Sequence, residues 1–258
     1  MSPAAATDLD HQLAADIALE TGRLLVELRD RLVADGVDGR TLKDEGDRQA
    51  HQYIVGRLST ERPDDGLLSE EGADDLARLD QRRVWIVDPL DGTREFSEPP
   101  RVDWAVHIAM AIDGEPVVGA VALPAEDLVM STGSPQSLPP AQDGPPRLVV
   151  SRSRPPAAAT HVASELDGEL VPMGSAGAKV MAVLLGRADV YAHSGGQYEW
   201  DSCAPFAVAQ AFGAHTSRVD GSPLRYNRPV PYLPDLLVCR PELAEPTLHA
   251  LAEFVEST

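Results

Sequence analysis

The pair Asp113-Gly114 separates two apolar runs, residues 104–112 and 117–123, both of which resemble β-strands in composition. Asp-Gly in this position predicts a tight β-hairpin, because both residues tolerate the positive φ that a two-residue turn requires. A hairpin joins antiparallel strands, so the chain does not follow a plan of parallel strands alternating with helices. We therefore expect an α+β fold with mixed, largely antiparallel sheets.

Helical patterns precede and follow these strands. Apolar residues recur near helical spacing between His11 and Val33, which predicts a long amphipathic first helix. Residues 47–60 predict a second helix, which ends before Pro63. Helices are also predicted at 176–187, at 201–212 and within 241–255, and strands at 84–87, 148–151, 188–193 and 235–239. Both parts of the chain therefore combine helices with strands.

Residues 132–146 contain many turn-forming residues and no periodic apolar face. This composition predicts an exposed connection between two parts of the fold. We expect an N-terminal α+β half, residues 1–140, and a C-terminal α/β half, residues 147–258, in one layered α-β-α-β sandwich. The chain has 258 residues, 43% of them hydrophobic, which is enough to build a core of this size.

The formal net charge of -19 restricts the partners of the chain. Affinity for a phosphate backbone comes mainly from clustered Lys and Arg, so this charge argues against a nucleic-acid-binding protein. No apolar run approaches the roughly 18 residues of a membrane span. We therefore expect no nucleic-acid partner and no membrane partner.

Two further observations concern the cellular compartment. The N-terminal residues 1–22 contain acids where a secretory signal has a basic segment. The cysteines, Cys203 and Cys239, are too few for a disulfide framework and lack the spacing of a zinc site. Both observations favour a reducing cytoplasm.

The stretch VWIVDPLDGTREF, residues 84–96, has two aspartates three positions apart at the end of an apolar run. Pro89 keeps the strand extended through Asp88, and the chain must then turn around Asp91. Both carboxylates and the Leu90 carbonyl can project from this strand end, and such hard oxygen ligands bind Mg²⁺. The alternative is an ordinary surface turn, since Asp-Pro and Asp-Gly are common in turns.

Thr93 follows this turn at the position expected of a helix N-cap, before Arg94, Glu95 and Phe96. The unpaired N–H groups at the start of a helix can hold a phosphate. Gly92 and Thr93 therefore form a candidate phosphate site. The alternative is that Thr93 is an ordinary cap.

Acidic residues also follow or begin two other predicted elements. Glu70 and Glu71 come after a short apolar run, and Asp201 stands at the start of an apolar, Ala-rich helix. Taken singly, the glutamates are typical of a solvated loop and Asp201 of a helix N-cap. Together with the aspartates of the 84–96 stretch, they form a candidate metal cluster whose members the fold would have to bring together.

The segments LSEE, WIVDPLDGT and WDSCAP carry a resemblance to a known family. In their order and approximate spacing, the chain resembles the lithium-sensitive, magnesium-dependent phosphatases of the inositol monophosphatase superfamily, which includes fructose-1,6-bisphosphatase and bisphosphate nucleotidase. The resemblance covers most of the chain, and the Asp-Pro-Leu-Asp-Gly-Thr string is highly specific. It implies hydrolysis of a small phosphate monoester by a metal-activated water, without a phosphoenzyme, with two or three Mg²⁺ ions per site.

The resemblance also implies a role for each matching residue. The implied metal ligands are Glu70, Asp88, the Leu90 carbonyl, Asp91 and Asp201. The implied catalytic residues are Asp47, Glu70 and Thr93, of which Asp47 works with Thr93 to polarise the attacking water. The implied substrate contacts are Leu90, Asp91, Gly92, Thr93, Lys179 and Asp201.

The chain departs from the family pattern at two places. Ser69 stands where the family often has glycine, and the residues before Asp47 lack the Ser/Thr-rich lead-in of many members. Asp47 can therefore also be interpreted as an acid that complements the dipole at a helix start. His107 and His193 are expected to be ordinary strand residues, because imidazole is not the expected ligand for magnesium.

Three shorter strings bear on the substrate. DGTREF, GSAGAK and SPLRYN are similar to those of the 3′-phosphoadenosine 5′-phosphate phosphatase branch, which implies this nucleotide as the substrate and a role in sulfate assimilation. In GSAGAK, small residues would let the backbone approach the nucleotide while Lys179 meets its second phosphate; the alternative is a packing turn with a solvated lysine.

Three alternatives stay open for the protein as a whole. It can be an inositol monophosphatase, a fructose-1,6-bisphosphatase, or a non-catalytic sensor of metal or nucleotide that keeps the fold. A monomer and a homodimer are both compatible with the sequence.

Overall fold

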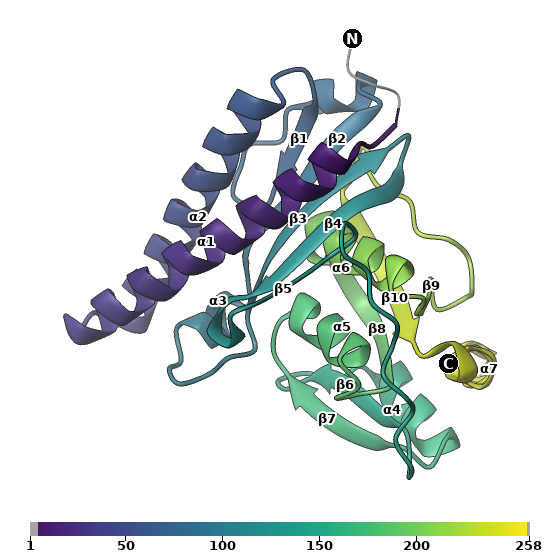
Figure 1. The fold of residues 1–258 in the computed structure, drawn as a ribbon. Helices are drawn as coiled ribbons and strands as arrows, with labels where there is room; N and C mark the ends of the chain where they lie inside the picture. Colours follow the sequence, from purple (N-terminus) through teal and green to yellow (C-terminus); the bar gives the residue numbers. More distant parts are fainter. Residues whose placement is uncertain (1–4, 257–258) are drawn as a thin grey trace.

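The computed structural model describes residues 5–256, whose strands form two five-stranded sheets (Figure 1). The order along the first sheet is β1 (Gly66–Ser69), β2 (Arg83–Asp91), β3 (Ala105–Ile112), β4 (Glu115–Leu123) and β5 (Leu128–Ser131). The order along the second is β7 (Glu169–Met173), β6 (Arg147–Ser151), β8 (Val190–Tyr198), β10 (Tyr232–Cys239) and β9 (His215–Ser217). Residues 132–146 contain no helix or strand and connect the two sheets.

Antiparallel strand pairs outnumber parallel ones. Parallel pairing is found between β1 and β2 and between β6 and its neighbours β7 and β8. The other neighbouring strands pair antiparallel. The hairpin between β3 and β4 turns at Asp113 (φ 51°) and Gly114 (φ 82°). The predicted α+β class, the mixed sheets and the hairpin are therefore confirmed.

The helices are arranged in layers around the sheets. Their bounds are α1 (Asp8–Ala34), α2 (Gly39–Glu61), α3 (Thr93–Phe96), α4 (Ala157–Glu165), α5 (Ala176–Leu184), α6 (Glu199–Ala211) and α7 (Ala244–Glu256), with short 3₁₀ turns at Leu76–Asp80, Pro124–Glu126 and Pro241–Leu243. α1 and α2 cover one face of the first sheet, where Ile17 and Ile54 pack in one cluster with Trp85 and Ile108.

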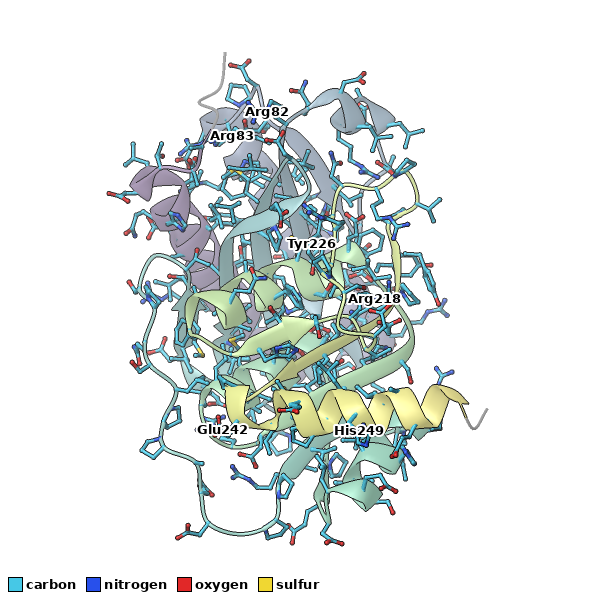
Figure 2. The ribbon with its side chains drawn as sticks, turned by 90° about the vertical axis from the view of Figure 1, so that its right-hand side faces the viewer. Arg82, Arg83, Arg218, Tyr226, Glu242 and His249 are labelled. Atoms are coloured by element: carbon cyan, nitrogen blue, oxygen red, sulfur yellow. The ribbon has the colours of Figure 1, made fainter. Side chains whose placement is uncertain are left out.

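α5 and α6 lie between the two sheets, and their apolar residues form the largest core cluster with both (Figure 1). α4 and α7 cover the outer face of the second sheet, as Figure 2 shows for α7. The fold thus has α-β-α-β-α layers, one helical layer more than the predicted sandwich. The extra layer is needed because Leu148, Val190 and Leu237 also present apolar side chains on that outer face.

Some predicted boundaries are wrong. α2 begins at Gly39 rather than at residue 47, because the side chain of Asp38 caps the helix by accepting hydrogen bonds from the N–H groups of Arg40 and Thr41. Asp47 therefore lies inside α2, and its interpretation as an acid at a helix start is wrong. α4, β5, β7 and β9 were not predicted.

Within residues 5–256, no helix combines the length and the hydropathy that a membrane span requires.

Candidate active site

The end of β2 presents two buried carboxylates. β2 pairs with β3 as far as Asp88, opposite His107, and the register then shifts before Asp91 pairs opposite Ala105. The side chain of Asp88 accepts a hydrogen bond from the Leu90 N–H at 3.0 Å, which fixes the bulge. Asp88 and Asp91 are 1% and 8% exposed, so the alternative of an ordinary surface turn is excluded.

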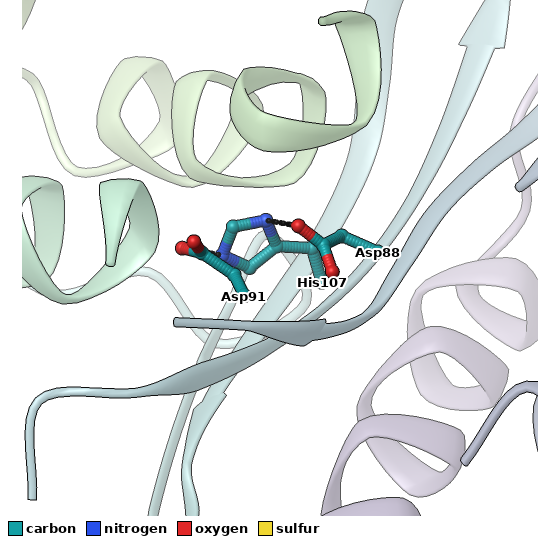
Figure 3. A group of neighbouring side chains, drawn as sticks. All are labelled: Asp88, Asp91 and His107. Carbon is teal, nitrogen blue, oxygen red and sulfur yellow. Dashed lines mark ion pairs between the residues drawn. The ribbon is translucent and has the colours of Figure 1, made fainter. Parts of the chain in front are cut away.

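His107 lies between these two aspartates (Figure 3). Its Nε2 atom is 3.2 Å from Oδ2 of Asp91, and its Nδ1 atom is 4.0 Å from Oδ2 of Asp88. Nδ1 also lies 3.1 Å from the Trp200 carbonyl oxygen, to which it can donate when protonated. The three side chains offer ligand atoms within 4.8 Å of one another and can hold a metal ion. The expectation that His107 is an ordinary strand residue therefore missed its contact with both aspartates.

One oxygen of Asp91 is held by several donors at once. Oδ2 accepts hydrogen bonds from the Ser175 hydroxyl at 2.5 Å and the Gly177 N–H at 2.7 Å, in addition to its contact with His107. Burial alone would raise the pKa of Asp91, but the charge of His107 and these hydrogen bonds lower it to about 2. Asp91 is therefore a fixed, ionised carboxylate.

The turn before α5 aims these donors at Asp91. Ser175 has a φ of 52°, an uncommon value for a residue with a side chain. Gly177 has no room for a side chain, because a Cβ atom there would lie 2.0 Å from Nε2 of His107. Backbone strain and close packing thus occur together where α5 meets Asp91.

Lys179 lies under this turn. Its side chain is 6% exposed, and its ammonium donates hydrogen bonds to the carbonyl oxygens of Ser175 at 2.7 Å and Gly174 at 3.3 Å. The ammonium is also 5.3 Å from the centre of the Tyr191 ring. The alternative of a solvated lysine is therefore wrong, and the role of Lys179 as a phosphate contact stays a prediction.

Two further acids join the pair on β2. Burial and the charge of Asp201 raise the pKa of Glu70 to about 7, and Glu70 shares a hydrogen bond with Asp88. Burial and the charge of Asp91 raise the pKa of Asp201 to about 6. Burial and the neighbouring acids raise the pKa of Asp88 well above its usual value. The fold therefore brings together the four predicted acids, although their role as metal ligands stays a prediction.

This donor set fits a hard cation. Asp88 and Asp91 are buried, and carboxylates that repel one another are stabilised either by protons, as the raised pKa values indicate, or by a positive ion. All four acids offer oxygen atoms, which are the ligands that Mg²⁺ prefers. Magnesium therefore suits these residues chemically.

Thr93 and Asp47 flank the acids. Thr93 is the first residue of α3, a helix of a single turn, and Gly92 (φ 86°) is its N-cap, so the prediction of Thr93 as the cap is wrong. The Thr93 hydroxyl donates to the Leu90 carbonyl at 3.4 Å.

α2 approaches this segment through Gly46, where a Cβ atom would lie 2.8 Å from the side chains of Leu90 and Phe96. Next to it, burial and the charges of Glu71 and Asp44 raise the pKa of Asp47 to about 7. Among residues 5–256, no direct hydrogen bond joins Asp47 to Thr93.

The family of the chain follows from a comparison of its whole sequence. The model of the inositol monophosphatase family matches residues 7–256, so the chain belongs to the inositol monophosphatase family. The resemblance expected from three short segments is thereby confirmed.

Individual relatives are found in several bacteria. A 3′-phosphoadenosine 5′-phosphate phosphatase of Mycobacterium bovis is 51% identical over 246 residues, which cover 91% of this chain and 90% of that protein. The 3′(2′),5′-bisphosphate nucleotidase CysQ of Escherichia coli is 32% identical, with 70% of this chain and 77% of that protein covered. The crystal structure of CysQ from Bacteroides thetaiotaomicron, at 29% identity, superposes with a TM-score of 0.77 over 90% of this chain and 97% of that one.

Proposed function

We propose that the chain is a magnesium-dependent phosphomonoesterase that removes the 3′-phosphate from 3′-phosphoadenosine 5′-phosphate, giving AMP and inorganic phosphate. The observation that carries this proposal is the cluster of Glu70, Asp88, Asp91 and Asp201, which the fold assembles from separate segments. The names of the relatives at 51% and 32% identity support the choice of substrate.

In this proposal, the four acids and the Leu90 carbonyl hold two or three Mg²⁺ ions. Bound Mg²⁺ would screen the phosphate dianion, lower the pKa of the attacking water and stabilise the leaving oxygen. The chain itself supplies fixed geometry, because hydrogen bonds to Oδ2 of Asp91 prevent that carboxylate from rotating. Because these contacts are all to Oδ2, Oδ1 of Asp91 would be the oxygen available to a cation.

The attacking water is oriented by Thr93 and Asp47. The Thr93 hydroxyl, next to the Leu90 carbonyl, would hold the water, and Asp47 would accept its proton, with Glu70 on the other side of the cluster. A pKa of about 7 suits Asp47 to this role, because a general base works best near the operating pH. Leu90, Asp91, Gly92, Thr93 and Asp201 would contact the substrate around the phosphate.

The test is a comparison of substrates. The purified protein is assayed with Mg²⁺ on 3′-phosphoadenosine 5′-phosphate, inositol 1-phosphate and fructose 1,6-bisphosphate, with and without lithium. We expect the highest kcat/KM for the nucleotide and inhibition by lithium. A higher kcat/KM for the inositol or sugar phosphate would refute the nucleotidase proposal, and no hydrolysis of any of them would favour a sensor.

For Lys179 we propose a positioning role in place of a phosphate contact. By holding the Gly174 and Ser175 carbonyls, its ammonium keeps the turn in the conformation that directs the Ser175 hydroxyl and the Gly177 N–H at Asp91. This role uses the buried position of the ammonium, whereas a phosphate contact would require the side chain to leave both carbonyls.

Replacing Lys179→Met is therefore expected to raise the Mg²⁺ concentration needed for half-maximal activity by about 10- to 100-fold, as is usual when the support of a metal ligand is removed. Arg40→Met, an exposed change at the start of α2, serves as the matched control. Thermal unfolding shows whether the variant is folded. If Lys179→Met raised KM for the nucleotide and left the Mg²⁺ requirement unchanged, Lys179 would be a phosphate contact instead.

We further propose that the protein acts in the cytoplasm, as a monomer or a homodimer. Light scattering on the purified protein would distinguish the two states.

A further inference from the structure

Three aromatic side chains gather where β8 ends and α6 begins. They are Tyr198, Trp200 and Tyr232, which we call the aromatic shelf. The rings of Tyr198 and Trp200 are stacked, with centroids 4.8 Å apart and planes 6° from parallel. The rings of Tyr232 and Tyr198 meet at nearly a right angle (83°), with centroids 6.1 Å apart. Tyr198 and Tyr232 remain 47% and 45% exposed, so the shelf is an ordered aromatic surface in contact with solvent.

The shelf is continuous with the candidate active site. The backbone N–H of Tyr198 donates a hydrogen bond to Oδ2 of Asp201 at 2.6 Å. The carbonyl of Trp200 contacts His107, which in turn contacts Asp91. A ligand whose phosphate lies at the acids therefore has an aromatic surface within reach of its remaining atoms.

The shelf is also held rigidly. Tyr198 and Tyr232 stand opposite each other in the register of β8 and β10. The ring of Tyr232 lies against Gly196, where a Cβ atom would be only 2.0 Å from the hydroxyl oxygen. At the neighbouring Gly195, by contrast, an added Cβ would meet nothing within 4 Å, so the surface beside the shelf is open. Rigid aromatic rings beside open space bind flat ligands at a low cost in conformational entropy.

We propose that the aromatic shelf stacks against the purine base of the nucleotide substrate. This inference rests on the proposed function, because only a nucleotide combines a phosphate for the acids with a flat base for the shelf. Stacking suits this chain, since a base ring is neutral and needs no cationic partner on a protein with a net charge of -19. The shelf would thus favour a nucleotide over a sugar or inositol phosphate of similar charge.

The test removes the stacking surface and leaves the acids in place. Stacking of a base on an aromatic side chain is worth about 1–3 kcal/mol, or roughly 5- to 150-fold. Tyr198→Ala is expected to raise KM for 3′-phosphoadenosine 5′-phosphate, and the Kd of AMP measured by calorimetry, by a factor in this range. Tyr198→Phe, which keeps the ring, is expected to stay within about twofold of the parent.

Two controls identify the base as the group involved. Ribose 5-phosphate is AMP without its base. The Kd of ribose 5-phosphate divided by the Kd of AMP is therefore expected to fall in Tyr198→Ala. The same ratio should stay unchanged in the control Leu170→Ala, which alters an exposed apolar residue on β7. The shelf does not bind the base if the parent hydrolyses the nucleotide but Tyr198→Ala raises the Kd of AMP and the Kd of ribose 5-phosphate by the same factor. The same conclusion follows if Tyr198→Ala changes neither Kd. If the parent does not hydrolyse the nucleotide, the proposed function fails and the shelf proposal fails with it.

Discussion

Replacing Asp91→Asn is expected to lower kcat/KM for 3′-phosphoadenosine 5′-phosphate by at least about 10³-fold. Asp91 is the acid of the cluster that the protein keeps ionised, with a pKa of about 2, and all of its protein partners contact Oδ2. A neutral amide would remove the charge that a cation needs. The loss corresponds to about 4 kcal/mol of transition-state stabilisation, which is within the several kcal/mol that a bound metal supplies.

The variant should still fold, because the asparagine oxygen can accept the hydrogen bonds from Ser175 and Gly177. Thermal unfolding without Mg²⁺ checks this, and calorimetry with Mg²⁺ alone measures binding apart from turnover. Asp64→Asn, an exposed acid before β1 and at the opposite end of the strands from Asp91, is the matched control and should behave like the parent. Full activity and unchanged Mg²⁺ binding in Asp91→Asn would remove Asp91 from the metal site.

Removal of Mg²⁺ by a chelator is expected to abolish activity, and its restoration should depend on pH. Without metal, Glu70 and Asp201 have pKa values of about 7 and 6, so both carry protons that Mg²⁺ must displace at low pH. The Mg²⁺ concentration for half-maximal binding should therefore rise by about tenfold in total from these two groups as the pH falls from 7 to 6, with about fivefold from Glu70 and about twofold from Asp201. A Mg²⁺ affinity that is constant between pH 6 and 8 would contradict this assignment.

The same acids predict how the stability of the metal-free protein changes with pH. The pKa of Glu70 is about 7 in the folded chain against an ordinary value of 4.5, and that of Asp201 is about 6 against 3.8. Between the ordinary and the folded-state pKa of each group, the folded chain therefore binds more protons than the unfolded chain. Their contribution to stability is therefore lost as the pH rises through about 4 to 7. The increase in Tm on adding Mg²⁺ should be larger at pH 8 than at pH 6, and an equal increase at both would argue against the cluster.

Local sequence signals predicted the parts of the site that depend on neighbouring residues. The Asp-Pro-Leu-Asp-Gly-Thr string defined the end of β2, and the Asp113-Gly114 pair defined the hairpin that makes the sheet antiparallel. Glu70 and Asp201 could be named because each lies at the end or start of a recognisable element. Their proximity was an expectation that only the packing of the layers could establish.

The support around Asp91 could not be predicted, because it depends on contacts between distant segments. His107 meets the aspartates through the register of β2 and β3, which a sequence alone does not give. Ser175 and Gly177 reach Asp91 only because α5 packs between the sheets. Lys179 was expected at a substrate phosphate for its charge, whereas the turn of α5 uses its ammonium as a donor to carbonyls.

The position of the acids between the layers gives a bound cation a second role. Asp88 belongs to the first sheet, whereas Asp201 belongs to α6, which follows a strand of the second sheet. No disulfide links these layers, because Cys203 and Cys239, the cysteines of the chain, are both free and buried. A cation held by Asp88 and Asp201 would close a long loop of the chain, as a disulfide does in other proteins, and such closures stabilise most when the loop is long. The proposed metal cofactor would then also be a cross-link between the layers.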